Sequence, residues 1–450
     1  MSEPLPPEPS KKEAHGNPYN FACQFRNWFG GHITYCIEQD RFFTHEKGIW
    51  EFKHNIEMMD LLVNAIEKTK KLPPAGRKQI LEDLKMLVKN RLENFNTTGE
   101  LNLTNGLLMP WTQILRPHDP KALSTIRLDY KYDPEAKCEL WLKTIGEILE
   151  NDTHKITMLQ EFFGYCLTRD TRMEKAMLLL GNSRSGKSTI LHTLRALLGS
   201  DNCSAVPIKY ISNPQYTSML MNKLVNMDAD VSGKAQDFEA EFKTITSGEP
   251  VSCSPKYIPT FEFKPYCKLV MAANVFPRIT DHSSAFYKRL ILIPCDRVFE
   301  EHEINRDLKQ QLTDELSGIL IWALEGLKRM NARNGFEQHD FMKSAIEELR
   351  EDSNPTDLFF KEHIEVDVKG GYEIDKLELY EKYKTWVKVT MPDNYTLSTI
   401  KFSQCIIMKY GRSTPKDSRS STTKRRIWRN LKYVDQKDQP DTAVPVSWQE

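Results

Sequence analysis

The sequence lacks the features that mark membrane proteins, disulfide-rich proteins and zinc proteins. Its 450 residues contain no run of about 18 apolar residues, so we expect no membrane-spanning helix. The nine cysteines never form a C-x-x-C pair, and none stands near two histidines at zinc-ligand spacing. This pattern is typical of scattered, reduced thiols in a cytosolic protein. Residues 1–17 are polar and proline-rich without the apolar segment of a signal peptide, so we expect a disordered tail there.

The chain also lacks net charge, because 62 lysines and arginines balance 62 aspartates and glutamates. That balance argues neither for nor against nucleic acid as a partner. The charge is unevenly distributed, however. Ten basic residues and one acidic residue, Asp417, lie between Lys401 and Lys432, which gives this segment a net charge of +9. Apolar residues make up 40% of the chain, as in ordinary globular proteins, and the length predicts several domains.

A strand–loop–helix pattern is the most specific feature of the sequence. The apolar residues Met177–Leu180 predict a short buried strand, and Thr189–Leu198 predicts a helix. Between them, Gly181–Ser188 matches G-x-x-x-x-G-K-[ST] without a gap. Glycines let successive backbone N–H groups point at phosphate oxygens, and the following helix directs its positive end at the same charge. We therefore expect a nucleoside triphosphate to bind here and disfavour a chance Gly/Ser loop.

Individual roles in this loop follow from the chemistry of its side chains. We expect Lys187 to place a positive charge near the β- and γ-phosphates and the Ser188 hydroxyl to ligate Mg²⁺. The residues expected to contact the nucleotide are Gly181, Asn182, Ser183, Arg184, Ser185, Gly186, Lys187, Ser188 and Thr189. The cofactors implied by this loop are ATP and Mg²⁺.

Two apolar segments further along the chain end in polar residues. Lys223–Asp230 finishes with the carboxylates of Asp228 and Asp230, which can hold Mg²⁺ or polarise the attacking water. The structural alternative is a strand-end turn that uses Asp for local hydrogen bonds. Lys268–Asn274 predicts a second buried strand, and Asn274 at its end can orient the lytic water or contact the γ-phosphate. We assign Mg²⁺ to Ser188 and Asp230.

The segment Val251–Phe263 predicts a hairpin whose tip carries Lys256 and Tyr257. A cation beside an aromatic ring can hold a phosphate and pack on a sugar or base, although an ordinary exposed turn remains the alternative. Arg289 precedes the apolar strand Leu290–Ile293. Arginines before strands are common on protein surfaces, but in a ring this one could reach a neighbouring subunit's nucleotide. The catalytic residues we expect are Lys187, Asp228, Asp230, Asn274 and Arg289.

Helical patterns dominate the rest of the chain. We expect a mixed, mostly helical accessory domain over residues 18–165, with a hairpin around Asn105–Gly106 and a helical pattern over 134–168. After this domain we expect an ATPase core over 166–300 and a helical lid over 301–350.

The segment 351–440 predicts helices at 358–366, 374–389 and 398–410, followed by a basic hairpin. Helices followed by such a hairpin suggest a winged-helix-like module that binds DNA phosphates. The hairpin residues expected to contact DNA are Lys424, Arg425 and Arg426. A solvated, charged loop is the alternative for this polar run.

Taken together, these motifs resemble the helicase half of the phage–plasmid and poxvirus primase–helicases, which are superfamily-3 members of the AAA+ ATPases. The motifs that carry the resemblance are the phosphate loop Gly181–Ser188, the acidic strand end Asn226–Asp230, the hairpin motif Thr246–Pro250 with Lys256-Tyr257, Ala272–Pro277 with Asn274, and Ala285–Leu290 with Arg289. Upstream, Leu103–Leu108, Tyr132–Trp141 and Leu159–Tyr165 are similar to the domain that precedes the ATPase in that family.

The resemblance implies an α/β fold with an AAA+ core, in which helices flank a parallel sheet. It implies an ATP-dependent DNA helicase, usually a hexamer that moves 3′ to 5′ on one strand, which replicates a phage, plasmid or similar element in the bacterial cytoplasm. Such proteins often carry an upstream primase domain. We expect no room for one here, so a separate primase or polymerase, or a single-strand-binding protein, is the expected partner.

Two matters stay open in the sequence. Asp230 stands where many relatives carry Glu, and Asp228 occupies a position that is commonly small and uncharged, so the sequence does not choose the essential aspartate. An origin-recognising initiator or ATP-gated switch that does not unwind DNA is the competing hypothesis. A small-molecule P-loop kinase is disfavoured by the hairpin, by the basic C-terminal segment and by the pair Asn274 and Arg289.

Overall fold

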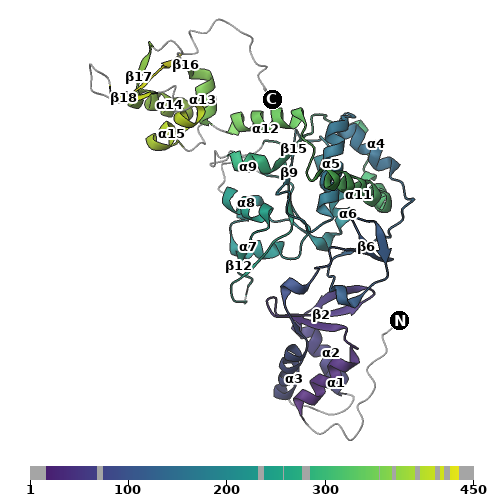
Figure 1. Cartoon of the computed structure of the whole chain (residues 1–450). Helices are drawn as coiled ribbons and strands as arrows, with labels where there is room; N and C mark the ends of the chain where they lie inside the picture. Colours follow the sequence, from purple (N-terminus) through teal and green to yellow (C-terminus); the bar gives the residue numbers. More distant parts are fainter. Residues whose placement is uncertain are drawn as a thin grey trace. The chain divides into compact units, whose positions relative to one another are not determined.

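The computed structural model of the chain contains two compact units (Figure 1). The structure describes residues 17–67, 74–231, 238–256, 258–275, 284–353, 355–366, 371–390, 396–410, 416–419 and 426–434. The first unit holds the described residues from 17 to 339, except 275 and 284–288, which belong with residues 340–434 to the second unit. Within this described part of the chain, no helix is both long and apolar enough to cross a membrane.

A five-stranded sheet, parallel throughout, forms the centre of the first unit. In spatial order its strands are β10 (Cys203–Ser204), β11 (Val225–Asp228), β14 (Lys268–Ala273), β9 (Ala176–Leu180) and β15 (Leu290–Pro294). Nearly every residue of β9, β14 and β15 is buried. Continuous apolar strands of this kind are expected where both faces of a parallel sheet are covered. The prediction of a parallel sheet is therefore confirmed.

Helices and a hairpin complete this half of the unit. Their bounds are α5 (Thr153–Cys166), α6 (Lys187–Leu198), α7 (Pro214–Thr217), α8 (Glu239–Ser247), the strands β12 (Val251–Cys253) and β13 (Phe261–Phe263), α10 (Leu308–Asp314) and α11 (Leu316–Arg333). Two glycines, Gly164 and Gly326, let helices α5 and α11 approach closely. A Cβ atom on either glycine would collide with the backbone of the opposite helix. The buried carboxylate of Glu161 on α5 accepts two 2.7 Å hydrogen bonds from Arg333 on α11.

The N-terminal part of the first unit contains two four-stranded sheets. One has the order β3 (Ile49–Lys53), β2 (Arg41–Glu46), β1 (Ile33–Cys36), β4 (Lys89–Asn90), and the other β7 (Ile114–Arg116), β6 (Gly106–Met109), β5 (Leu101–Leu103), β8 (Arg127–Leu128). The helices here are α1 (Pro18–Trp28), α2 (Asn55–Glu67), α3 (Pro74–Leu87) and α4 (Glu139–Ile148). Leu101 pairs with Leu108 in an antiparallel ladder, which confirms the predicted hairpin at Asn105–Gly106.

The helical pattern over 134–168 resolves into two helices, α4 and α5. Glu150 and Asn151 between them adopt left-handed backbone conformations, which end the first helix. Asp152 then caps α5 by accepting hydrogen bonds from the amides of His154 and Lys155. Asp152 is therefore the N-terminal cap of α5.

The second unit contains short helices and short strands around a core rich in aromatic rings. The described elements are α9 (Ser284–Arg289), α12 (Asp340–Ser353), α13 (Pro355–His363), β16 (Ile364–Val366), β17 (Glu373–Asp375), α14 (Lys376–Thr390), α15 (Thr399–Tyr410), β18 (Lys416–Arg419), β19 (Arg426–Arg429) and β20 (Leu431–Tyr433). Strands β18 and β19 pair antiparallel, which confirms the predicted basic hairpin.

Two predicted helix boundaries in this unit are wrong. The helix expected over 358–366 ends at His363, because residues 364–366 pair with β20. The helix expected from residue 374 begins at Lys376, because residues 373–375 pair with β19. In both places three residues that fit the helical pattern form a short strand instead. The strand with which they pair lies more than 50 residues further along the chain, so the local sequence does not reveal it.

We predict that Glu161→Ala lowers the free energy of unfolding of the first unit by about 2 kcal/mol, since it removes charge-assisted hydrogen bonds to α11. Trp141 and Trp322, whose rings lie 5.5 Å apart in this unit, allow urea unfolding to be followed by fluorescence. Glu337→Ala removes the other carboxylate near Arg333, which lies at 3.7 Å and is 45% exposed, and should change stability by less than about 0.5 kcal/mol. Equal losses in the two variants would contradict this assignment.

Candidate nucleotide-binding site

Three strand ends meet at one edge of the parallel sheet. Strand β14 lies between β9 and β11, with Ala273 opposite Leu180 and Met271 opposite Asp228. The amide of Gly181 also donates a 3.2 Å hydrogen bond to the carbonyl oxygen of Ala273. The phosphate loop, Asn274 and the acidic strand end are therefore neighbours, although about 90 residues separate the first two in sequence.

The loop 181–188 is shaped by two glycines. A Cβ atom on Gly181 would collide with the carbonyl oxygen of Cys295, so no larger residue fits there. Gly186 has φ of 83° and caps α6, and a Cβ atom on it would lie 2.5 Å from Ile148. Because α6 begins at Lys187, its N-terminal end adjoins the loop and favours an anion there.

Lys187 is held inside this loop. Its Nζ donates hydrogen bonds to the carbonyl oxygens of Gly181 at 2.6 Å and Asn182 at 2.7 Å, and to Oδ1 of Asn274 at 3.1 Å. Burial lowers the pKa of the Lys187 ammonium, and the nearby Asp230 carboxylate opposes that shift. The Lys187 ammonium therefore occupies a cradle of neutral oxygens, which are weaker partners than a phosphate would be.

Asn274 connects two sides of the loop. Its Oδ1 accepts from Lys187, and its Nδ2 donates a 3.2 Å hydrogen bond to the hydroxyl of Ser183. Ser188 follows Lys187 in the first turn of α6 and is exposed. These positions agree with contacts to a phosphate chain, which would lie over the loop and the start of α6.

The two aspartates have different surroundings. Oδ2 of Asp228 accepts a 2.7 Å hydrogen bond from the amide of Ile208, in the 3₁₀ turn η4 (Ile208–Tyr210). Asp230 is exposed. The next residue, Val231, still lies beside β14, since its amide donates a hydrogen bond to the carbonyl oxygen of Ala272. Asp228 thus fastens the strand end to a neighbouring turn, whereas the Asp230 carboxylate remains accessible at the edge of the sheet.

The surroundings of Ser188 and Asp230 fit a Mg²⁺ ion bound mainly through nucleotide and water. Among the described residues, no group of three or more His, Cys, Asp and Glu side chains could hold a metal. Mg²⁺ is commonly held by one or two protein oxygens together with substrate phosphates and water, and so needs no such cluster.

Arg289 lies at the opposite edge of the sheet. Leu290 pairs with Ala176 at the start of β9, whereas Gly181 follows the end of that strand. At about 3.3 Å per residue, this places Arg289 about 20 Å from the phosphate loop along the strand direction. Its guanidinium donates to Glu174 at 2.6 Å and to the Ser247 hydroxyl at 3.1 Å. Arg289 therefore cannot complete the nucleotide site of its own chain.

The predicted hairpin between Val251 and Phe263 is confirmed, with Val251 opposite Phe263 in an antiparallel ladder. Lys256 is exposed near its tip, whereas Tyr257 lies outside the described residues. The hairpin therefore carries at least one cation, Lys256, at its surface.

Two tyrosines beside this hairpin were missed in the sequence. Tyr210 and Tyr216 stack with ring centroids 5.0 Å apart, are 41% and 37% exposed, and carry Lys209 Nζ 4.8 Å above the first ring. The amide of Ser254 in the hairpin donates to the carbonyl of Pro214, which ties the two segments together. Exposed stacked rings beside cations suit nucleic-acid bases. The signal that could have found them is two aromatics in an otherwise polar segment around an Asn-Pro turn.

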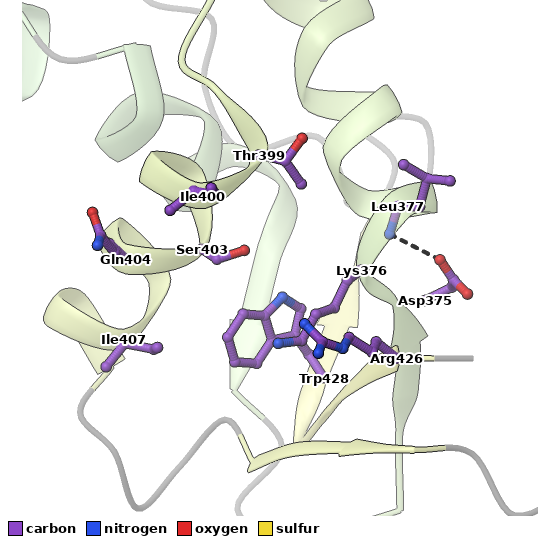
Figure 2. Close-up of a pocket in the computed structure, with 10 residues that line it drawn as sticks. All are labelled: Asp375, Lys376, Leu377, Thr399, Ile400, Ser403, Gln404, Ile407, Arg426 and Trp428. Atoms are coloured by element: carbon purple, nitrogen blue, oxygen red, sulfur yellow. Dashed lines mark hydrogen bonds between the residues drawn. The ribbon is translucent and has the colours of Figure 1, made fainter. Parts of the chain in front are cut away.

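In the second unit, Arg426 is the one predicted DNA contact that the structure describes, since Lys424 and Arg425 lie outside the described residues. Figure 2 shows Arg426 on β19 beside Lys376 and Trp428, facing α15. These residues line an open hollow of about 690 Å³.

Two family profiles match the sequence. The profile described as D5 N terminal like matches residues 22–150, and that of a family of unknown function (DUF5906) matches residues 179–289. The second match runs from the phosphate loop to Arg289.

Among solved structures, an A form apo structure of the NrS-1 C-terminal region is similar with a TM-score of 0.51 and 12% sequence identity, over 92% of this chain and 99% of that one. A second apo structure of that region has a TM-score of 0.49, 12% identity and coverage of 93% of this chain and 99% of that one. The TM-score of 0.51 shows a shared fold across nearly the whole chain, and the D5 N terminal-like match supports a relation to the phage primase–helicases.

We predict that Asp228→Ala lowers stability by about 1–2 kcal/mol, since it leaves the Ile208 amide without its acceptor. Asp230→Ala should change stability by less than about 0.5 kcal/mol but abolish Mg²⁺-dependent nucleotide hydrolysis. Asp228→Asn, which keeps an oxygen to accept from the Ile208 amide, should retain most of the parent's stability and hydrolysis rate. Thermal unfolding and phosphate release measure the two effects. If Asp228→Asn lost hydrolysis and Asp230→Ala kept it, Asp228 rather than Asp230 would be the essential aspartate.

Proposed function

We propose that this chain is an ATP-dependent replicative DNA helicase of a phage, plasmid or other mobile element. The observation that carries the proposal is the meeting of Lys187, Asn274 and Asp230 at one edge of the sheet. A cation, an amide and a carboxylate so arranged suit the phosphates, the attacking water and the metal of triphosphate hydrolysis. The D5 N terminal-like match supports the replication setting.

Each residue of the site has a distinct part in this reaction. The loop amides and Lys187 bind the phosphates, with the Lys187 ammonium exchanging the carbonyls of Gly181 and Asn182 for phosphate oxygens. Asn274 positions the attacking water. Mg²⁺, held by Ser188 and Asp230, would neutralise charge on the phosphate oxygens.

Arg289 completes the site of an adjacent subunit. The distance of about 20 Å between Arg289 and the loop of its own chain excludes action in cis and supports action across an interface. A closed ring, such as a hexamer, supplies every subunit with one such neighbour. Hydrolysis then depends on assembly, because each nucleotide lies between a loop from one subunit and a guanidinium from the next.

The DNA strand is contacted by the hairpin and the tyrosine pair. Lys256, near the hairpin tip, and Tyr257, which follows it in the sequence, act with nucleotide state to draw one strand through the ring. Tyr210 and Tyr216, tied to the hairpin through Pro214, supply rings on which bases stack without sequence preference.

The competing function is an ATP-gated initiator that assembles on duplex DNA and does not unwind it processively. The basic segment of the second unit, which carries Arg426, favours this alternative as much as the helicase. A strand-displacement assay on forked DNA separates them, because the initiator hydrolyses ATP slowly and displaces no strand.

Mixing two inactive variants tests the shared site. Lys187→Ala and Arg289→Ala should each reduce ATP hydrolysis by at least about 10³-fold. A 1:1 mixture should recover about a quarter of the parent rate, since random assembly in a ring joins an intact loop to an intact arginine at one interface in four. Steady-state phosphate release on the assembled protein measures both results.

The control for this experiment is Arg172→Ala, which removes an exposed arginine paired with Asp170. It should hydrolyse ATP like the parent, and its 1:1 mixture with Arg289→Ala should give about half of the parent rate, because it supplies an intact Arg289 at half of the interfaces. Absence of recovery in a mixture that native mass shows to be co-assembled would overturn the shared site, as would full activity in monomeric parent protein.

Replacing the hairpin cation or the tyrosines should separate hydrolysis from DNA coupling. Lys256→Ala and Tyr216→Ala should keep basal ATP hydrolysis, lose its stimulation by single-stranded DNA, and weaken single-strand binding about tenfold or more. Tyr216→Phe keeps the stacked ring and should behave like the parent. Tyr19→Ala, at an exposed tyrosine in α1, is the matched control. Unwinding at the parent rate by Lys256→Ala would contradict the hairpin assignment.

A further inference from the structure

Helix α15 presents a polar, acid-free face to solvent. Its inner face is fixed, because Phe402 and Ile406 are buried in the core of the second unit. The helix contains two lysines and no acidic residue. The α15 residues that line the hollow recur at helical spacing and are Thr399, Ile400, Ser403, Gln404 and Ile407. Of these residues, Thr399, Ile400 and Gln404 are exposed, so the helix presents hydrogen-bonding and apolar side chains along one face.

The opposite wall of the hollow carries two cations. Figure 2 shows Lys376 and Arg426 across the hollow from α15, with the Trp428 ring between them and the helix. Asp375, the one acidic residue that lines the described hollow, caps α14 by accepting hydrogen bonds from the amides of Leu377 at 2.8 Å and Glu378 at 3.2 Å. The charge that faces an incoming ligand is therefore mainly positive.

We propose that this surface binds double-stranded DNA, with α15 in the major groove. The groove is about 12 Å wide and admits a helix. Amide and hydroxyl groups such as those of Gln404 and Ser403 hydrogen-bond to base edges there, and Ile400 contacts thymine methyl groups. Arg426 and Lys376 bind the flanking phosphates. The proposal deepens the DNA-binding part of the proposed function and is independent of ATP hydrolysis.

Burial of the aromatic ring distinguishes this surface from a single-strand site. Proteins bind single strands by stacking bases on exposed aromatic rings. Trp428, the aromatic residue that lines the hollow, is only 1% exposed, and Lys376 Nζ lies 3.7 Å from its ring centroid. A base therefore cannot stack on it. The exposed aromatic pair Tyr210 and Tyr216 belongs to the other unit.

Selection from a random duplex library by the full-length Lys187→Ala protein, without nucleotide, tests the proposal. This variant lacks the lysine of the loop 181–188, so the measured DNA binding does not depend on whether the ATPase assignment is correct. We expect an enriched sequence, bound more tightly as duplex than as either single strand in fluorescence anisotropy. Gln404→Ala in the same background should reduce discrimination at one base position about tenfold and leave non-specific affinity unchanged. Arg426→Ala should weaken binding to all duplexes and reduce the salt dependence by about one ion.

Lys384→Ala is the matched control, because this α14 lysine lies near Glu381 and outside the lining of the hollow. It should bind the enriched duplex like its parent. The proposal is overturned if no sequence is enriched, if single strands bind as tightly as duplex, or if Gln404→Ala leaves the preference unchanged. Binding of a protein partner that Gln404→Ala weakens, without any duplex binding, would also overturn it.

Discussion

The parallel pairing of β14 between β9 and β11 is the constraint on which the candidate nucleotide site depends. Each of these strands brings one polar group to the same edge, and their registers set Leu180 level with Ala273 and Asp228 level with Met271. Every residue of β14 is buried, so a shift in its register would disrupt the packing on both faces of the sheet. Burial of an apolar strand therefore fixes the place of Asn274 relative to Lys187 more firmly than their hydrogen bond does.

The same sheet separates the loop from Arg289. Parallel strands carry all their carboxyl ends to one edge, and Arg289 precedes β15, so it lies at the amino edge beside Glu174. A group at that edge cannot reach a phosphate at the other edge of the same chain. If Arg289 acts in hydrolysis, it acts between subunits. Dependence of activity on assembly would then follow from strand direction alone.

The sequence predicted the local parts of this architecture well. The strand–loop–helix around 181–188, the hairpin over 251–263 and the basic hairpin could be read from it, because short-range spacing and turn residues determine them. The sequence could not distinguish Asp228 from Asp230, because the difference lies in a hydrogen bond from Ile208, 20 residues away. Tyr210 and Tyr216 were missed for a different reason, since their stacking depends on the conformation of the turn at Asn213–Pro214 between them.

The two DNA-binding surfaces proposed here differ in the one property that separates single-strand from duplex recognition. Tyr210 and Tyr216 expose their rings beside Lys209, and bases can stack on them only after leaving the double helix. Trp428 is covered by Lys376, so the adjoining face of α15 offers groups suited to base edges in an intact groove. A chain that carries both can hold the duplex with one unit and the separated strand with the other. This division of roles would suit a motor that works where duplex becomes single strand.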